Sequence, residues 1–313
     1  MLLVYISSGI MAFLIFAVLL TAYICFARVF LSDRRKNKPA GFELPPGEEY
    51  EPFRPVMKGW YNQLSGLEYT PVSIKSHDNL TLRGRYYEIE KGAPVELMFH
   101  GYRGNSVRDL SGGVFRAFSL GHNVIIIDHR GSGDSDGRVI TFGINECRDC
   151  LGWIEFALSY FGNDVRLILT GISMGAATVV MASSREIPEN VRYVLADCPY
   201  SSQREIIKSV IAKMGLPGDI LYPFVKLGGR IFGNFDLEEQ FPIEAAAKSR
   251  VPIIFFHGDA DDFVPFHMSE RLYEACCSEK KLVCVKGAGH GLAYPVDREG
   301  YLDSLREFDR RYL

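Results

Sequence analysis

Residues 165–180 read VRLILTGISMGAATVV, and this stretch decides the fold of the chain. It begins with an aliphatic run that is typical of a buried strand and ends with small, apolar residues at helical spacing. Gly171-x-Ser173-x-Gly175 stands between the two patterns. Such a motif also arises by chance, but rarely at a junction of this kind. The stretch therefore predicts a sharp strand-to-helix turn that holds Ser173 in a strained, exposed corner as a candidate nucleophile.

Length and composition suit one α/β domain with additional segments. The chain has 313 residues, 47% of them hydrophobic, which is enough to bury a large core. A formal net charge of −3 gives no electrostatic case for binding nucleic acid. The seven cysteines are odd in number, which favours a reducing compartment over a secreted disulfide framework.

The first 31 residues predict a transmembrane anchor. Residues 1–27 carry no charged side chain, and a helix of about 26 residues is roughly 39 Å long, enough to span a bilayer. A cleaved signal peptide is the alternative, but the segment shows no positive n-region and no clear A-x-A-like site. The basic residues that follow predict a cytoplasmic location for the rest of the chain. They are Arg28, Arg34, Arg35, Lys36 and Lys38.

The remainder divides into a linker and a catalytic-sized body. Residues 32–66 are basic and rich in Pro and Gly, which predicts a linker. Strand and helix patterns alternate over residues 67–313, which indicates a mostly parallel sheet with helices on both faces. An antiparallel hairpin at 72–75 and 80–87 begins this body. Residues 199–250 break the alternation with large apolar residues at helical spacing, and we expect them to form a short helical lid.

Two later loops supply the partners that a nucleophilic serine requires. A serine hydroxyl needs an adjacent base, most often histidine, and a carboxylate that orients the imidazole. The sequence HGDADDFVP begins at His257 after one predicted strand, and KGAGHG, which contains His290, follows the next. The carboxyl ends of parallel strands meet at one edge of a sheet, where ligands bind. The order serine, acid, histidine is thus present along the chain.

From about residue 67 onward the chain resembles the α/β-hydrolase superfamily. The resemblance depends on His100-Gly-Tyr-Arg-Gly104, Asp128-His-Arg-Gly-Ser-Gly133, the Ser173 motif and the two loops just quoted. The chain is most similar to bacterial single-pass, membrane-anchored serine hydrolases, and more distantly to prolyl-oligopeptidase-type enzymes. The resemblance implies the α/β-hydrolase fold and hydrolysis that depends on a serine.

The resemblance also implies a catalytic triad of Ser173, Asp261 and His290. Members of the family place the acid in a D-x-x-V-P context. That context selects Asp261 over its neighbours Asp259 and Asp262, which we interpret as loop-capping or solvated groups.

Two backbone amides are implied as the oxyanion hole. They belong to Met174, directly after the nucleophile, and to Tyr102, which follows His100-Gly101. The Tyr102 phenol either assists as in prolyl-oligopeptidase relatives or packs against the lid, and His100 is interpreted as a loop organiser. The sequence holds no His, Asp and Glu cluster at metal-ligand spacing, so we expect neither a metal nor another cofactor.

These observations predict an esterase that forms an acyl-enzyme on Ser173, with apolar acyl esters favoured by the apolar insert and the anchor. The expected partners are a small or lipid-like ester and the membrane, with the oligomeric state left open. A peptidase or amidase of prolyl-oligopeptidase type is the alternative, and thioester hydrolysis and acyl transfer also fit. A non-enzymatic scaffold is disfavoured because Ser, Asp and His are all present, although fold alone does not decide function.

Overall fold

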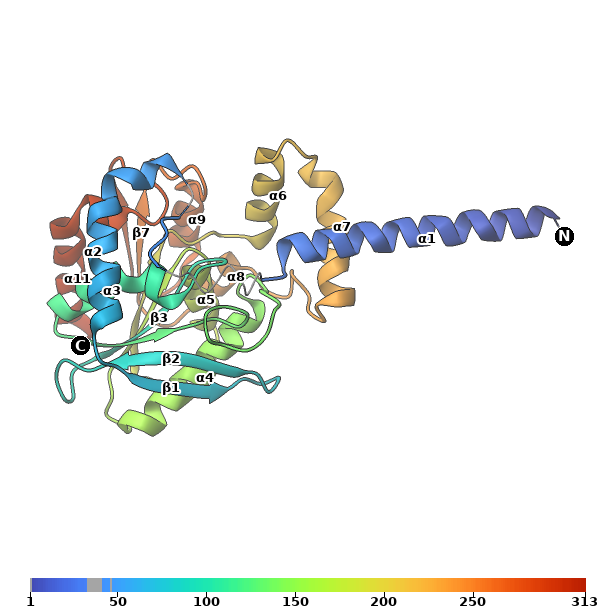
Figure 1. The fold of residues 1–313 in the computed structure, drawn as a ribbon. Helices are drawn as coiled ribbons and strands as arrows, with labels where there is room; N and C mark the ends of the chain where they lie inside the picture. The colour runs from blue at the N-terminus through green and yellow to red at the C-terminus, as the bar shows by residue number, and fades with distance from the viewer. Residues whose placement is uncertain (1, 33–40, 46) are drawn as a thin grey trace.

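Buried aliphatic strands build the centre of the molecule. The computed structural model describes residues 2–32, 41–45 and 47–313. Within these residues, eight strands form one sheet in the order β1-β2-β4-β3-β5-β6-β7-β8, with helices packed on both faces (Figure 1). The strands are β1 (Thr70–Lys75), β2 (Thr81–Tyr87), β3 (Val95–Phe99), β4 (Asn123–Ile127), β5 (Leu167–Ile172), β6 (Val191–Asp197), β7 (Ile253–Gly258) and β8 (Lys280–Val285).

The sheet is mixed at one end and parallel elsewhere. β2 pairs antiparallel with both β1 and β4, and the strands from β4 to β8 are parallel to one another. Every residue of β3, β4 and β7 is buried, as expected for strands that helices cover on both sides. The expected α/β architecture, including the antiparallel hairpin, is confirmed.

The helices of the body follow the alternating pattern. Asn105 caps α3 by accepting a hydrogen bond from the Arg108 amide, and Asp297 caps the last helix in the same way through Gly300. The helices are α3 (Ser106–Ser119), α4 (Ile144–Phe161), α5 (Met174–Ala182), α8 (Pro242–Ala246), α9 (His267–Ala275), α10 (Ala293–Val296) and α11 (Arg298–Tyr312).

A buried carboxylate ties α3 to the middle of the sheet. Glu96 on β3 is fully buried and accepts hydrogen bonds from Arg116 of α3, from His122 and from Thr170 of β5. Burial alone would raise the pKa of Glu96, but the Arg116 guanidinium and His122 lower it to about 2. The network fixes β3 and β5 relative to each other, and both strands lead into the candidate site.

The linker expected over residues 32–66 is helical in its second half. Residues 48–66 form the 3-10 helix η1 (Glu48–Phe53) and the helix α2 (Arg54–Gly66), which packs against α3. Pro55 lies in the first turn of α2, where its missing N–H costs no hydrogen bond. Pro55, one of the prolines that indicated a linker, thus lies at a helix start. Residues 33–40 and 46 lie outside the described residues.

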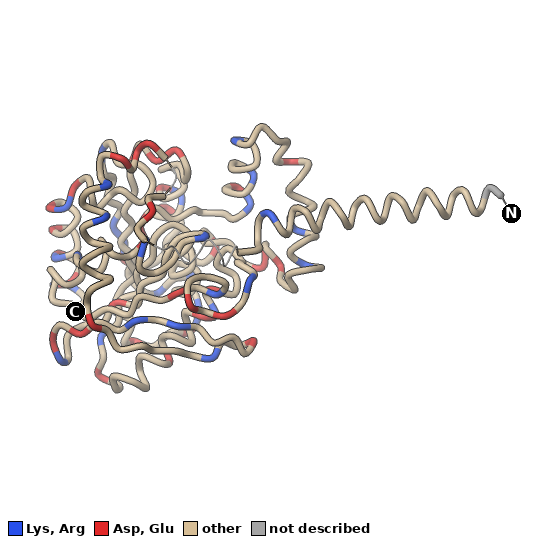
Figure 2. Tube along the Cα trace, in the orientation of Figure 1, with Lys and Arg blue, Asp and Glu red and all other residues tan. Residues whose placement is uncertain are grey.

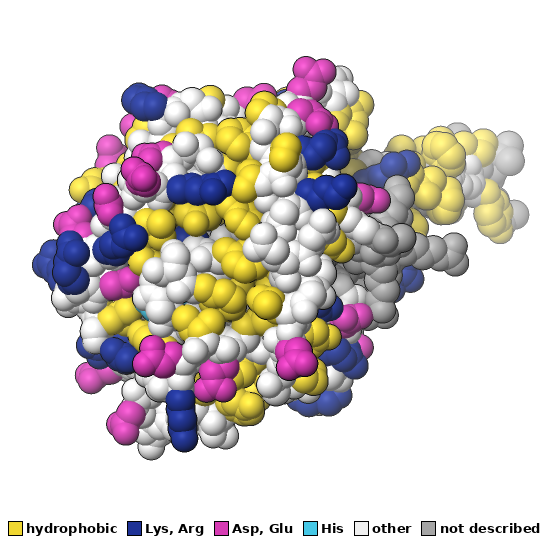
Figure 3. Space-filling view, turned by 60° about the vertical axis from the view of Figure 1, so that its left-hand side comes forward, with side chains coloured by type: hydrophobic (Ala, Val, Ile, Leu, Met, Phe, Trp, Pro, Cys, Tyr) yellow, Lys and Arg dark blue, Asp and Glu magenta, His cyan; other side chains and the backbone are white. Residues whose placement is uncertain are grey.

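The N-terminal helix α1 (Leu2–Val29) has two different halves. Residues 4–20 are almost entirely exposed, whereas Ala22, Phe26 and Phe30 are buried against the body. The 26 residues of Val4–Val29 are apolar and long enough to cross a membrane by length and composition. In Figure 2, α1 carries no charged residue before Arg28 in its last turn, and in Figure 3 its side chains are mostly hydrophobic beside a mixed, charged body.

The end of α1 continues directly into the body. Leu31 forms a β-bridge with Val139, the Ser32 amide donates to the Arg138 carbonyl, and the Ile140 amide donates to the Phe30 carbonyl. The predicted anchor over residues 1–31 therefore includes a C-terminal part that is integral to the folded body.

The predicted lid region contains a helical hairpin that contacts α1. Residues 199–250 hold α6 (Gln203–Lys213) and α7 (Gly218–Phe232), followed by α8, which packs under α5. The α6–α7 hairpin projects from the body, and α7 crosses α1 (Figure 1). Gly228 makes this crossing close, because a Cβ there would collide with the Ala22 carbonyl oxygen and with Phe26.

Candidate active site

Ser173 lies at the strained turn between β5 and α5. Its backbone φ is 55° and ψ is −115°, a combination that residues other than glycine rarely adopt. The turn is possible because both flanking positions are glycine. A Cβ on Gly171 would overlap the Gly175 backbone, and one on Gly175 would overlap the Phe99 carbonyl of β3. The motif therefore packs strand against helix while it holds the serine out of the sheet.

The structure brings Ser173, His290 and Asp261 together. His290 Nε2 lies 2.9 Å from Ser173 Oγ, and His290 Nδ1 lies 2.7 Å from Asp261 Oδ2. Asp261 is a carboxylate acceptor, so Nδ1 carries a proton that it donates, and the Nε2 lone pair then faces the serine hydroxyl. The loops after β5, β7 and β8 supply the three side chains, at the edge where the parallel strands end.

The Asp261 carboxylate is held by more groups than His290. Its Oδ1 accepts hydrogen bonds from the amides of Phe263 (2.9 Å) and Val264 (2.8 Å), and its Oδ2 lies 3.2 Å from Nε2 of the buried His257. Burial raises the pKa of Asp261, but the hydrogen bonds from His257 and His290 outweigh it, so the pKa is well below its usual value. Asp261 is therefore ionised at neutral pH. Neither Asp259, which pairs with Lys286, nor Asp262 contacts His290.

His257 was not assigned a role from the sequence, although it lies in the quoted loop. Its Nδ1 lies 2.6 Å from Ser269 Oγ and its Nε2 lies 2.8 Å from the Val264 carbonyl oxygen. Nε2 donates to the carbonyl, so Nδ1 accepts from the Ser269 hydroxyl. The signal that could have found it is its position at the end of a buried strand, four residues before Asp261.

The two predicted oxyanion amides belong to Met174, directly after Ser173, and to Tyr102, in the loop that follows β3. Met174 is the first residue of α5, so its amide has no acceptor within the helix. His100 Nδ1 lies 2.7 Å from the Gly101 carbonyl oxygen, and His100 Nε2 accepts from the His129 amide. Because a trans peptide points its N–H opposite to its C=O, this bond turns the Tyr102 amide away from His100. His100 thus organises the loop, as predicted.

The Tyr102 phenol was expected either to assist at the oxyanion or to pack against the lid, but it contacts α1 instead. Its hydroxyl donates to the Val29 carbonyl of α1 at 2.6 Å, and its ring packs 4.8 Å from the ring of Phe142. Burial raises the pKa of Tyr102 to about 12, so the phenol is neutral. The side chain therefore connects the loop after β3 to the end of α1.

Tyr50 reaches the site from the segment that was expected to be a linker. Its ring is buried, and its hydroxyl donates to the His290 backbone carbonyl at 2.9 Å. The bond steadies the backbone of the histidine loop. No pattern in the sequence distinguishes this tyrosine from others in a Pro-rich stretch.

The α6–α7 hairpin contacts the acid loop. The Lys213 ammonium at the end of α6 donates to the Asp262 carbonyl, and Glu205 of α6 pairs with Arg271 of α9 at 2.7 Å. Phe263, in the same loop, places its ring 5.0 Å from the His290 ring. The hairpin is thus attached beside the triad.

Cys198 adds a thiol to the same cluster. Its Sγ, a carboxylate oxygen of Asp261 and a ring nitrogen of His290 lie within 4.8 Å of one another, a set that could ligate a metal ion. Burial raises the pKa of Cys198 well above its usual value, and a metal requires the thiolate. The aspartate and histidine are moreover bonded to each other. The donor set therefore fits a hydrogen-bonded triad better than a metal centre.

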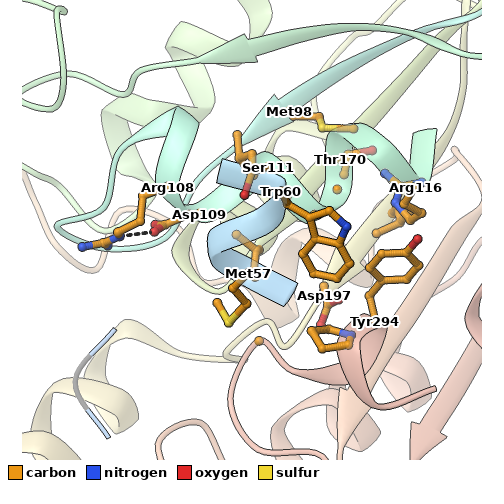
Figure 4. Close-up of a pocket in the computed structure, with 18 of the residues that line it drawn as sticks. Met57, Trp60, Met98, Arg108, Asp109, Ser111, Arg116, Thr170, Asp197 and Tyr294 are labelled. Carbon is orange, nitrogen blue, oxygen red and sulfur yellow. Dashed lines mark hydrogen bonds and ion pairs between the residues drawn. The ribbon is translucent and has the colours of Figure 1, made fainter. Parts of the chain in front are cut away.

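A cavity of about 80 Å³, shown in Figure 4, borders the segments that lead to Ser173 and His290 through Ile172 and Gly291. Trp60 and Tyr294, whose rings stack at 5.6 Å, form one wall, and Gly291 brings it next to the histidine loop. Asp197 lines it with Oδ2 accepting from the Tyr301 hydroxyl, whereas Oδ1 has no hydrogen-bond partner among the described residues. Burial raises the pKa of Asp197 to about 6. Neither Ser173 nor His290 is among its lining residues in the described chain.

Two family models match overlapping parts of the chain. A model of the alpha/beta hydrolase fold matches residues 95–220, and a model of serine hydrolase (FSH1) matches residues 171–292. The two matches together extend from β3 to the loop that carries His290.

Individual relatives and solved structures agree with these matches. The YqkD protein of Bacillus subtilis is 26% identical over 79% of this chain and 81% of its own length. Lysophosphatidylserine lipase ABHD12 of Xenopus tropicalis is 26% identical over 80% of this chain and 61% of its own length. The esterase Pf2001 of Pyrococcus furiosus matches with a TM-score of 0.64 and 21% identity, over 80% of this chain and 95% of that one, which shows a shared fold.

Proposed function

The chain belongs to the α/β-hydrolase superfamily, and we propose that it is a serine hydrolase that cleaves carboxylic esters with apolar acyl chains. One observation carries the proposal: His290 bridges the Ser173 hydroxyl at 2.9 Å and the Asp261 carboxylate at 2.7 Å. A base oriented in this way is what a serine hydroxyl needs to become a nucleophile at neutral pH.

The first half of the reaction forms an acyl-enzyme. Ser173 Oγ attacks the carbonyl carbon of the ester while its proton passes to His290 Nε2. Asp261 stabilises the imidazolium that results. The amides of Tyr102 and Met174 donate hydrogen bonds to the oxyanion. His290 then gives its proton to the departing alkoxide, the bond from the carbonyl carbon to the alcohol oxygen breaks, and the acyl group stays on Ser173.

The second half releases the acid. Water takes the place of the alcohol and loses a proton to His290 Nε2 as it attacks the acyl carbon. Collapse of the tetrahedral intermediate breaks the bond to Ser173 Oγ, which recovers the proton from His290. A thioester substrate would form the same acyl-enzyme, so the substrate series below includes acyl thioesters.

An apolar, lipid-like substrate is favoured by where the site lies. We propose that α1 spans a bilayer with the body on the cytoplasmic side, because its exposed half is uncharged and basic residues follow it. The Phe263 ring lies against the His290 ring, so an apolar side chain borders the candidate base, and the end of α1 contacts the loop of Tyr102 through the Val29 carbonyl. The lysophosphatidylserine lipase named among the relatives acts, by its name, on a lipid ester.

The structure does not support the observation that favoured the peptidase alternative. That observation was a Tyr102 phenol available to the oxyanion, and the phenol instead donates to the Val29 carbonyl.

The test of the proposal is active-site labelling combined with a substrate series. Fluorophosphonate should label the full-length chain, leave Ser173→Ala unlabelled, and label the control Ser119→Ala as it labels wild type. Turnover of p-nitrophenyl esters should rise from acetate to medium-length acyl chains and exceed that of aminoacyl nitroanilides and acyl thioesters. Equal labelling of wild type and Ser173→Ala would exclude Ser173, and faster nitroanilide cleavage would reassign the substrate class.

A further inference from the structure

Helix α7 has an apolar face that the protein leaves uncovered. Ile220, Phe224, Leu227 and Ile231 follow one another at steps of four, three and four residues, so they lie along one side of the helix. Ile220 is 64% exposed and Ile231 is 49% exposed, while Phe224 and Leu227 are half-buried. We call these four residues the outer stripe.

The opposite side of α7 is the side that packs against the rest of the protein. Tyr222, Val225 and Gly229 are buried, and helical geometry places them roughly half a turn from the outer stripe. A helix that packs on a globular body needs one apolar side, and the other is ordinarily polar. The outer stripe is therefore not explained by packing within the described chain.

The crossing with α1 sets the position of α7 along the proposed span. α7 meets α1 where Gly228 approaches Ala22, and the Tyr23 and Phe232 rings pack edge to face at 5.2 Å. The twenty residues of α1 before Ala22 make about 30 Å of helix, which equals the thickness of a bilayer's hydrocarbon core. When α1 spans the membrane, α7 thus lies at the level of the membrane surface.

The direction of the outer stripe agrees with this position. In Figure 1, α6 lies between α7 and the rest of the body, and α1 extends past α7 away from the body, across the line of α7. The buried side of α7 faces α6 and the body, so the outer stripe faces the side toward which α1 extends. Lys226 and Arg230 lie along one side of the stripe, where they pair with Glu238 and Asp236, so charged groups border the apolar residues as in helices that lie in a membrane interface.

We propose that α7 is an interfacial helix that rests on the leaflet from which α1 emerges, with the outer stripe inserted at the boundary between headgroups and acyl chains. The inference goes beyond the hydrolase activity and rests on the proposed span of α1. Its consequence for the site is direct, because α6 joins α7 to the acid loop through Lys213 and Asp262. The membrane contact holds the triad close to the surface where lipid esters lie.

The first experiment measures depth and needs no turnover. Leu227→Trp in the full-length chain, reconstituted in phosphatidylcholine and phosphatidylglycerol vesicles, should be quenched by lipids brominated near the headgroup. Tyr160→Trp on α4 serves as the control, since Tyr160 is an exposed aromatic residue on the surface of the body. Trp60 and Trp153 contribute the same background to both variants. We expect quenching of the added fluorescence at 227 to be at least about three-fold stronger than at 160.

Equal quenching at the two positions would overturn the proposal, as would crosslinking between two copies through position 227 with no lipid quenching, which would assign the stripe to a dimer. Ile220→Trp provides a second position if Leu227→Trp does not fold. An absence of esterase activity leaves this measurement intact, so failure of the hydrolase proposal is distinguishable from failure of this one.

The second experiment tests the consequence for substrate access. A triple variant, Ile220→Glu with Leu227→Glu and Ile231→Glu, should hydrolyse a short soluble ester within about two-fold of wild type. Its turnover of a long-chain ester embedded in vesicles should fall by about ten-fold or more. A triple Glu variant at exposed residues of α2, Asn62→Glu with Gln63→Glu and Ser65→Glu, adds the same three negative charges and controls for them. Equal loss on both substrates, or no loss on either, would contradict a role for the stripe at the membrane.

Discussion

The loops around the triad and the outer face of the α1–α7 pair are built on opposite principles. Around the triad the polar groups are held by hydrogen bonds, and Asp261 alone is contacted by two amides and two imidazoles. The outer face consists mainly of apolar side chains that are at least partly exposed and lie on residues 4–20 of α1 and on the outer stripe.

The difference separates interactions that fix the geometry of the triad from interactions that would fix the position of the protein at a membrane. Hydrogen bonds are directional, so a saturated network holds the imidazole between a hydroxyl and a carboxylate. Apolar burial is non-directional and suits contact with a fluid, disordered phase. Changes in the first region should therefore affect all substrates alike, whereas changes in the second should affect only substrates that reside in a membrane.

The largest expected effect is the loss of the base. His290→Ala should lower kcat/KM by several powers of ten for soluble and vesicle-embedded esters alike, as removal of a triad member does. Steady-state kinetics on both substrates measures it, with circular dichroism as the control for folding. Near-normal activity, or a loss confined to one substrate, would contradict the assignment of His290 as the base.

Two N-terminal truncations separate the exposed part of α1 from the part that packs against the body. Removal of residues 1–20 should leave a folded body with wild-type turnover of a soluble ester, because these residues contact little of the body. Removal of residues 1–31 also deletes the buried Phe30, and loss of such a core aromatic costs about 3–5 kcal/mol. It removes the Val29 carbonyl that anchors Tyr102 as well.

Thermal unfolding of the two truncated chains tests whether residues 21–31 contribute to the stability of the body. The shorter truncation should match full-length protein in Tm, and the longer one should fall well below it. Equal stability of the two would show that α1 is an anchor and nothing more.

A smaller effect is expected at Tyr50. Tyr50→Phe keeps the buried ring and removes the bond to the His290 carbonyl, which is worth about 1 kcal/mol, or roughly a five-fold change. We expect the loss in kcat, with KM unchanged. Tyr61→Phe on α2 is the matched control and should leave kcat unchanged. A rise in KM alone would indicate that Tyr50 contacts substrate instead.

The last expected effect is on stability and not on turnover, and it is a change in pH dependence at Asp197. Its raised pKa, about 6, means that the folded state holds the proton more tightly than the unfolded state, whose carboxyl titrates near 4. The stability this confers is complete below about pH 4 and is lost as the pH rises to about 6. Asp197→Asn should remove this loss, which gives a gain of about 3 kcal/mol above pH 6 and little at pH 4. Denaturant melts at the two pH values measure it, and a gain at pH 4 would show another cause.

The sequence predicted the sheet and the meeting of the site residues for one reason. Ser173, Asp261 and His290 each follow a buried strand, and parallel strands end at a common edge, so topology alone brings them near one another. The structure places them within hydrogen-bonding distance. Their catalytic roles, and those of Tyr102 and Met174, stay predictions that the labelling and kinetics address.

What could not be predicted depended on packing between segments distant in the chain. The helix α2 was hidden because Pro55 was interpreted as linker composition rather than as a first-turn proline. Tyr50 and the end of α1 gain their roles only through contacts with residues that are 240 and about 73 positions away. Local periodicity carries no information about such partners, and side-chain identity alone did not separate the buried half of α1 from the exposed half.

The bridge between Leu31 and Val139 has a consequence for how the protein meets its substrate. With α1 spanning a bilayer as we propose, the helix continues into the body without a slack tether, so the site would keep one height and one tilt above the lipid. The encounter is then a search in two dimensions, governed by lateral diffusion and by the surface density of the ester rather than by its bulk concentration. Dilution of the substrate within the vesicle bilayer should therefore slow turnover even when its total amount is held constant.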